Sequence, residues 1–116
     1  MSKVCYFASD APLKAIHPFI WEIKPYSEAP KTDKKYFAEV AELDENDLSL
    51  IIGYIQDHMK KKKDIKVRDL EFYYLWLGND EEDIIEKTCS LEEFTEGSLK
   101  QILLDDDNDY KIIITR

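Results

Sequence analysis

Glycine is scarce in this sequence, with three residues among 116, and cysteine is scarcer still, with two. A glycine-rich phosphate-binding loop is therefore excluded, because such loops need several glycines within a few residues. An iron–sulfur cluster is excluded as well, since it needs four cysteine thiolates. We expect no cofactor. We also expect Cys5 and Cys89 to be reduced thiols, because they lie far apart in a sequence without secretory features.

Long hydrophobic runs are also missing. No stretch approaches the about 20 apolar residues of a membrane-spanning helix, and residues 1–10 lack the apolar core of about 7–15 residues that marks a signal peptide. Hydrophobic residues nevertheless make up 44% of the chain and aromatic residues 12%, which is typical of a globular protein. These features predict a cytoplasmic protein.

All four prolines lie within residues 12–30, so this segment differs in composition from the rest of the chain. Because proline fixes φ and removes a backbone donor, this segment is expected to be irregular. Its apolar residues predict that it folds back over the protein, with a short edge strand at 19–23. We expect one domain over 1–116, made of an N-terminal strand with the irregular segment (1–34) and a regular core (35–116).

From residue 35 onward the hydrophobic pattern becomes regular. It predicts two amphipathic helices, one beginning after Asp44 and one following a Ser90–Glu93 capping box as far as Leu104. Both alternating sets of the 69–78 segment are apolar or aromatic, so this strand is expected to be covered on both faces or to use one face as an interface. Strands are predicted at 3–9, 35–43, 69–78, 84–89 and 109–115.

The order of these elements after residue 35 predicts an α+β fold of the ferredoxin-like βαββαβ type. In that arrangement a mainly antiparallel four-stranded sheet carries both helices on one face. The strand at 3–9 and the proline-rich segment are then additions to this core. An open α+β sandwich with another strand order is the main alternative.

The run DDDND, from Asp105 to Asp109, raises the question of a calcium site. An EF-hand loop needs oxygen ligands at its positions 1, 3 and 5, glycine at 6 and glutamate at 12. Aligned on Asp105, the chain has Tyr110 at position 6 and Arg116 at position 12. The sharp turn and the bidentate ligand are both missing, which leaves at most a loose, weak cation site. We predict a solvated turn before the last strand and no metal site.

Cysteine and histidine supply few other candidates for chemistry. A zinc site would need all of Cys5, Cys89, His17 and His58, which include no closely spaced pair. Cys89 lies beside Lys87 and before a helix N-terminus, where an exposed thiol has a lowered pKa. A buried strand cysteine is the more common case. An enzyme using Cys89 or some of the carboxylates is therefore the less favoured hypothesis.

Negative charge is concentrated towards the C-terminus. The net charge is −9, and twelve acidic residues lie within 80–109 together with two lysines. A field of this sign repels phosphate backbones and suits a basic partner, although a solvated surface is the simpler alternative. RNA-recognition motifs share the βαββαβ order, but their third strand carries aromatic residues, which 84–89 lacks. We expect neither nucleic acid nor a membrane as a partner.

Two classes of function stay open. The first is a small acidic interaction domain without catalytic chemistry, which binds a protein partner or a second copy of itself. An immunity-type inhibitor of a basic toxin is an alternative version of this class. The second is the enzyme considered above. Aromatic residues often anchor interfaces, so the candidate contact residues are Phe19, Trp21, Tyr73 and Trp76, with plain core packing as the alternative for each.

Five short segments carry a resemblance to known proteins. They are YFASDAPL (6–13), YFAEV (36–40), LIIGYIQDHMKK (50–61), YYLWLG (73–78) and KTCSLEEFTEGSLKQIL (87–103). They resemble segments of a family of small, functionally uncharacterised bacterial proteins, chiefly from Firmicutes. Its members share an opening Y-A-x-D-x-P-L, a strand ending in W-L-G, and a closing helix and strand. The resemblance spans most of the chain and implies no activity and no catalytic residues.

Overall fold

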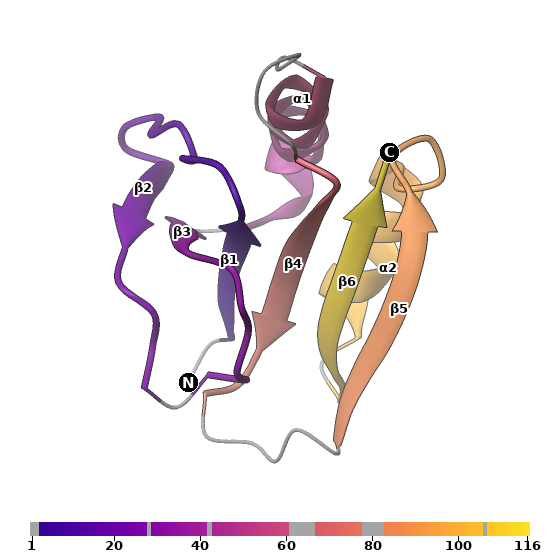
Figure 1. Ribbon diagram of the computed structural model, residues 1–116. Coiled ribbons are helices and arrows are strands. Elements are labelled where there is room, and N and C mark those ends of the chain that lie inside the picture. The colour runs from indigo at the N-terminus through magenta and orange to yellow at the C-terminus, as the bar shows by residue number, and fades with distance from the viewer. Residues whose placement is uncertain (1–2, 28, 42, 61–66, 78–82, 106) are drawn as a thin grey trace.

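The computed structural model describes residues 3–116, apart from 28, 42, 61–66, 78–82 and 106. The described residues form a six-stranded sheet and two α-helices, so the fold is α+β as predicted (Figure 1). In spatial order the strands are β2 (Ile20–Ile23), β3 (Tyr36–Val40), β1 (Val4–Ser9), β4 (Asp69–Leu75), β6 (Asp109–Thr115) and β5 (Ile84–Ser90). The helices are α1 (Leu48–Lys60), preceded by the 3₁₀ turn η1 (Glu45–Asp47), and α2 (Glu96–Leu104). Neither described helix has the length and apolar character needed to cross a membrane.

Strand β1 lies at the centre of the sheet because it is apolar on both faces. It pairs antiparallel with β3 on one side and with β4 on the other. Every side chain from Cys5 to Ser9 is buried, and a strand without exposed positions has to be covered on both faces. Strand β5 is the opposite case. Its residues Glu86, Lys87 and Thr88 are exposed, and the strand takes an edge of the sheet.

Both helices cover the same face of the sheet (Figure 1). The main core lies between them and alternate residues of the central strands, such as Phe7 and Phe72. The opposite face carries a smaller core around Tyr6 and Tyr73, whose rings stack with their centroids 4.7 Å apart. Strand β4 contributes to both cores, which confirms that it is covered on both faces.

The segment that follows β2 lies over the smaller core. Thr32 donates a hydrogen bond of 2.7 Å to the buried Glu71 carboxylate, which also accepts one of 2.6 Å from the Tyr73 hydroxyl. Tyr26 donates a hydrogen bond to Glu39 of β3. The buried Glu71 carboxylate needs hydrogen-bond donors, and one of them comes from Thr32 in the irregular stretch. These contacts therefore hold the stretch against the sheet.

The ferredoxin-like arrangement is not what the sheet shows. The predicted succession of elements is present as β3-α1-β4-β5-α2-β6, but the strands pair in another order. Strand β1 separates β3 from β4, whereas β5 and β6 are direct neighbours and run parallel. A ferredoxin-like sheet is antiparallel and has no such additional central strand. The prediction treated the strand at 3–9 as an addition to a four-stranded core. In the structure that strand, β1, is buried and takes the central place between β3 and β4.

The first helical segment begins where the sequence predicts. The Asp44 side chain accepts a hydrogen bond of 2.7 Å from Asn46 N and caps η1, which continues into α1. The predicted apolar stripe of α1 faces the main core.

The second helix begins later than predicted. Ser90 and Glu93 form the expected capping box, with Ser90 N donating to the Glu93 carboxylate over 2.9 Å and Glu93 N donating to Ser90 Oγ over 3.2 Å. Residues 91–93 then form a turn, and α2 starts at Glu96 with Thr95 as its N-cap. The capping box therefore stabilises the connection between β5 and α2, while Thr95 caps the helix itself.

Candidate functional site

The candidate site is the outer edge of β5, where the sheet ends. Strand β6 pairs with one side of β5, and a hydrogen bond of 2.6 Å from Leu91 N to Thr115 O fixes which residues face it. Alternate residues of a parallel strand direct both backbone groups to the same side. Glu86 and Thr88 consequently turn their N–H and C=O groups outward. Among the described residues, these four backbone groups have no hydrogen-bond partner.

The edge is closed at its C-terminal end by the turn that follows it. Ser90 also faces outward, but its N–H donates to Glu93 and its C=O accepts from Glu93 N and Phe94 N, each at 3.1 Å. The hydrogen bonds from the Ser90 N–H and hydroxyl lower the pKa of the Glu93 carboxyl, because they stabilise its charged form. The part of the edge open to a partner therefore centres on Glu86 and Thr88.

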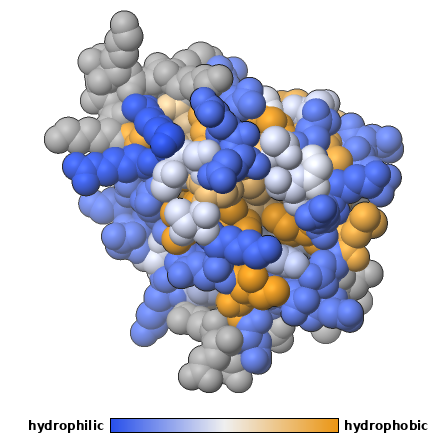
Figure 2. Space-filling model, turned by 90° about the vertical axis from the view of Figure 1, so that its right-hand side faces the viewer, coloured by the Kyte–Doolittle hydropathy of each residue, from blue (hydrophilic) through white to orange (hydrophobic). Residues whose placement is uncertain are grey.

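A groove runs beside this edge on the helix-covered side of the sheet. It is a cavity of about 240 Å³ between β5 and α2. Its buried lining is apolar or aromatic and consists of Phe94, Ile102, Tyr110 and Ile112. Its more exposed lining includes Lys87, Glu93, Ser98 and Gln101. Figure 2 views this side of the molecule and shows hydrophobic atoms gathered in a hollow bordered by hydrophilic side chains.

The groove is smaller than a typical binding site for a small molecule. Pockets for drug-sized ligands usually measure about 300–1,000 Å³, so a cavity of about 240 Å³ suits a single side chain of a partner. A larger cavity, of about 560 Å³, lies between the last turn of α1, residues 90–92 and Arg116. Its lining contains no cysteine or histidine, and the Ser90 hydroxyl there is already bonded to Glu93.

The acidic residues of the 80–109 stretch do not form one uniform surface, and among the residues that line the groove Glu93 is the acidic one. Residues 80–82 and 106 lie outside the described structure, and Asp109 is buried. The exposed acidic residues of the stretch are Asp83, Glu86, Glu92, Glu93, Glu96 and Asp107. Most of them lie on β5 or between β5 and the first turn of α2. The predicted acidic face is therefore narrowed to the border of the β5 edge.

The two lysines at this edge are already held by neighbouring groups. Lys111 Nζ lies 3.3 Å from the Glu86 carboxylate, and Lys87 Nζ lies 5.9 Å from the centre of the Tyr110 ring. A cation over an aromatic face is attracted by the ring electrons. Both lysines keep their charge, but the exposed residues of 83–96 include five acidic side chains and one lysine, so negative charge predominates along this edge.

Neither cysteine is an activated nucleophile. Cys89 lines the groove, and its pKa is raised, first by burial and then by the negative charge of Glu93. Burial, with a smaller contribution from Glu39, also raises the pKa of Cys5. A thiol with a raised pKa stays protonated and reacts poorly. The structure thus gives no support to catalysis by Cys89, because burial and Glu93 raise the pKa of its thiol.

Described residues of the DDDND run contact the ammonium group of Lys3, and Asp107 in the same run lies in a turn. Lys3 Nζ donates to the backbone carbonyls of Asp105, at 2.9 Å, and Asn108, and it lies 4.0 Å from the Asp109 carboxylate. The predicted turn is confirmed, but its predicted solvation is wrong for Asp109, whose side chain is 3% exposed and also accepts a hydrogen bond from Trp76 N. Within the described part of the chain, no three His, Cys, Asp or Glu residues cluster in a way that could hold a metal ion.

The histidines and cysteines considered for zinc or for catalysis do not assemble into one site. His58 Nε2 lies 2.8 Å from Ser9 Oγ, and both residues are buried. Ser9 Oγ also accepts a hydrogen bond from Ala11 N. The pair links α1 to β1 inside the protein, and His17 lies in the exposed turn before β2. Sequence reasoning missed the Ser9–His58 contact because the two residues are 49 positions apart.

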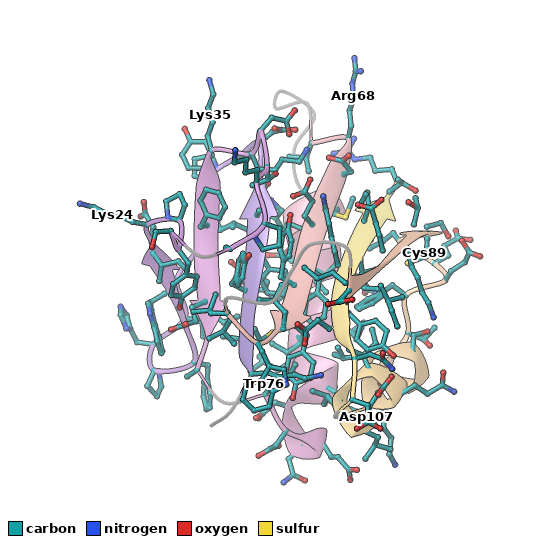
Figure 3. The ribbon with its side chains drawn as sticks, turned by 90° about the horizontal axis from the view of Figure 1, so that it is seen from below. Lys24, Lys35, Arg68, Trp76, Cys89 and Asp107 are labelled. Carbon is teal, nitrogen blue, oxygen red and sulfur yellow. The ribbon has the colours of Figure 1, made fainter. Side chains whose placement is uncertain are left out.

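The four aromatic contact candidates do not form one surface. Tyr73 is completely buried in the smaller core, so plain packing accounts for it. Phe19 is 41% exposed in the turn before β2, and Trp21 is half-buried in β2. Trp76 is half-buried after β4, at the end of the sheet where Asp107 lies (Figure 3). A contact role for these last three stays a prediction.

The opposite edge of the sheet offers less to a partner than β5 does. A hydrogen bond of 2.8 Å from Ala41 N to Phe19 O sets the ladder between β2 and β3. Ile20 and Glu22 then face outward, but Ile20 exchanges two backbone hydrogen bonds with Ile16. Among the described residues, Glu22 alone is left facing outward without a backbone partner.

Comparison with known proteins adds no assignment to this geometry. No family model matches the chain, and no curated protein or solved structure matches it. The resemblance to small bacterial proteins therefore stays a prediction, and the β5 edge with its groove is supported by its geometry alone.

Proposed function

We propose that this protein is a non-catalytic interaction domain that binds an extended segment of another polypeptide at the β5 edge. The observation that carries the proposal is the outward direction of the Glu86 and Thr88 backbone groups beside an apolar groove. An added strand pairs with such groups and places alternate side chains in pockets next to the edge. A location in the cytoplasm, where the free thiols of Cys5 and Cys89 stay reduced, forms part of the proposal.

Self-association through β5 is less favourable than binding of a different chain. Two β5 strands related by a two-fold axis pair antiparallel, and their longest overlap is centred on Lys87. This register places the two Lys87 side chains opposite each other, where like charges repel. An immunity-type inhibitor is a special case of this proposal, in which the partner is a basic toxin.

The proposal is tested by blocking strand addition with proline. The N–H of Thr88 faces away from β6, and edge strands accept proline at such positions. Thr88→Pro therefore keeps the fold but removes one outward donor and obstructs the edge, whereas Thr88→Val keeps the donor. Glu22→Pro places the same change at the outward position of the β2 edge and serves as a matched control.

The measurement is affinity capture from a lysate of the native host, with circular dichroism to confirm that each variant is folded. We expect the wild type, Thr88→Val and Glu22→Pro to capture the same stoichiometric partner, and Thr88→Pro to lose it at least tenfold. Equal capture by Thr88→Pro, or the absence of any stoichiometric partner, would count against strand addition at β5.

A further inference from the structure

We infer that the segment bound at β5 carries basic side chains on one face and, on the other, an apolar side chain that enters the groove. The inference rests on the proposed function and deepens it by naming the class of partner. It follows from a difference between the two sides of the edge, because an added strand directs successive side chains to opposite faces of the sheet.

On the helix-covered side, the added strand lies over the groove. The register of β5 with β6 places Lys87 and Cys89 on this side, and both line the cavity. The deepest lining is apolar, and the volume of about 240 Å³ suits one aliphatic side chain. Burying an apolar side chain there removes it from water, while a charged one would lose its hydration without a buried partner. The side chain that enters the groove is therefore apolar.

On the open side of the sheet, the added strand lies next to Glu86. The Glu86 side chain is 58% exposed, so its ion pair with Lys111 leaves the carboxylate accessible to a second cation. Glu93 lines the groove on the other side of the sheet, where it is exposed and has a lowered pKa, so it adds negative charge along the same edge. Side chains on this face are therefore lysine or arginine, and an acidic strand is repelled.

Three synthetic peptides of seven residues test this inference, matched to the length of β5. The peptide KVKLKVK alternates basic and apolar residues, EVELEVE reverses the charge, and KVKPKVK interrupts the strand. Each carries a fluorescent label, and its binding is followed by fluorescence anisotropy. We expect KVKLKVK to bind at least tenfold more tightly than either control, and more weakly as the salt concentration rises.

Variants of the protein locate the binding. Gln101 lines the groove and is exposed, so Gln101→Trp fills the cavity without entering the core. Lys100→Trp makes the same addition at the neighbouring exposed position, which does not line the groove. We expect Gln101→Trp to weaken KVKLKVK at least tenfold and Lys100→Trp to leave it nearly unchanged. Glu86→Gln should weaken it about two- to fivefold, the usual range for one exposed charge pair.

The outcomes separate the inference from the proposed function. If EVELEVE binds as well as KVKLKVK and Thr88→Pro abolishes both, the basic class is wrong and strand addition stands. If KVKLKVK binds equally to wild type, Gln101→Trp and Thr88→Pro, it binds elsewhere and both are wrong. If no peptide binds while the wild type still captures a partner that Thr88→Pro loses, the inferred class is wrong and the proposed function stands.

Discussion

At the scale of single residues, Lys3 shows how a charge becomes part of the interior. Its ammonium group reaches oxygen atoms of Asp105 and Asn108, which lie more than 100 positions away in sequence. Lysine is normally exposed, so nothing in the sequence pattern connects Lys3 with the DDDND run. Of the carboxylates that resemble calcium-loop ligands, Asp109 pairs with Lys3, while the Asp105 carboxylate accepts hydrogen bonds from Asn108 and Tyr110.

Replacement of Lys3 by methionine should destabilise the fold. We expect Lys3→Met to lower the free energy of unfolding by about 3 kcal/mol, because removal of one partner from a buried ion pair leaves the other charge uncompensated. Urea denaturation followed by circular dichroism measures the change. Lys100→Met, at an exposed position of α2, is the control and should have no measurable effect. A loss below about 1 kcal/mol in Lys3→Met would show that the pair contributes little.

The aromatic residues show what sequence can and cannot tell about a single side chain. Tyr73 and Phe19 are both large and apolar, yet one is completely buried and the other 41% exposed. Tyr73 is covered because its strand has a neighbour on each side and the segment after β2 lies over it. That covering depends on pairing between distant segments, which residue type does not specify.

At the scale of elements, two capping patterns precede α2, the Ser90–Glu93 box and Thr95, and only Thr95 is the N-cap of the helix. The Thr95 side chain accepts a hydrogen bond from Ser98 N, so it satisfies one of the free donors of the first turn. The capping box five residues earlier satisfies donors of a turn instead. The Ser90–Glu93 pattern correctly predicted a capping box, but it did not show that the box precedes a turn and not the helix α2 itself.

Replacement of Thr95 by alanine should therefore weaken α2 directly. We expect Thr95→Ala to lower the free energy of unfolding by about 1 kcal/mol, the usual cost of losing an N-cap. Thermal or urea denaturation measures it, and Thr95→Asn, which keeps a capping oxygen, should retain most of the stability. If Thr95→Ala is as stable as the wild type, the helix start does not depend on this cap.

Most strands and helices could be predicted from the sequence, whereas the order of the strands could not. Hydrophobic periodicity depends on neighbours along the chain, and it located β3, β4 and α1 to within a few residues. The central place of β1 had one visible sign, an uninterrupted apolar run from Val4 to Ala8, which is typical of a strand covered on both faces. Pairing partners depend on contacts across the chain, so that sign was outweighed by the familiar βαββαβ order.

The candidate site was predictable in part. The acidic character of 80–109 was visible in the sequence, and three successive polar residues in β5, from Glu86 to Thr88, are typical of a protected edge strand. Which backbone groups point outward follows only from the register between β5 and β6. The groove depends further on how far α2 stands from the edge. Neither the outward backbone groups nor the groove can therefore be predicted until the pairing of the strands is known.

At the scale of the whole molecule, several tyrosine hydroxyls are buried or bound. Burial raises the pKa of Tyr54 to about 12, and a hydrogen bond to Asp105 raises the pKa of Tyr110 to about 12. The pKa values of Tyr6 and Tyr73 are raised as well, mainly by burial. The folded protein thus holds these protons more tightly than the unfolded chain, whose tyrosines titrate near pH 10.

The fold should consequently lose stability in alkali. A group whose folded pKa is raised contributes stability that is complete below its unfolded pKa and is lost as pH rises through the folded value. We expect this contribution to be intact up to about pH 10 and to disappear towards pH 12. Tyrosinate absorbance and far-ultraviolet circular dichroism, recorded together, should change in the same pH range. Titration of all tyrosines near pH 10 in a protein that stays folded would contradict the prediction.

The central position of β1 also governs how the protein is made. Val4 pairs with Leu75, so β1 leaves the ribosome about 70 residues before its partner in β4 has been synthesised. At about 5–20 residues per second, that interval lasts roughly 4–14 s. During this time an apolar strand destined for the centre of the sheet has no neighbour on its β4 side. Transiently exposed apolar surface and unpaired strand edges favour aggregation, so β1 is most at risk before β4 pairs with it.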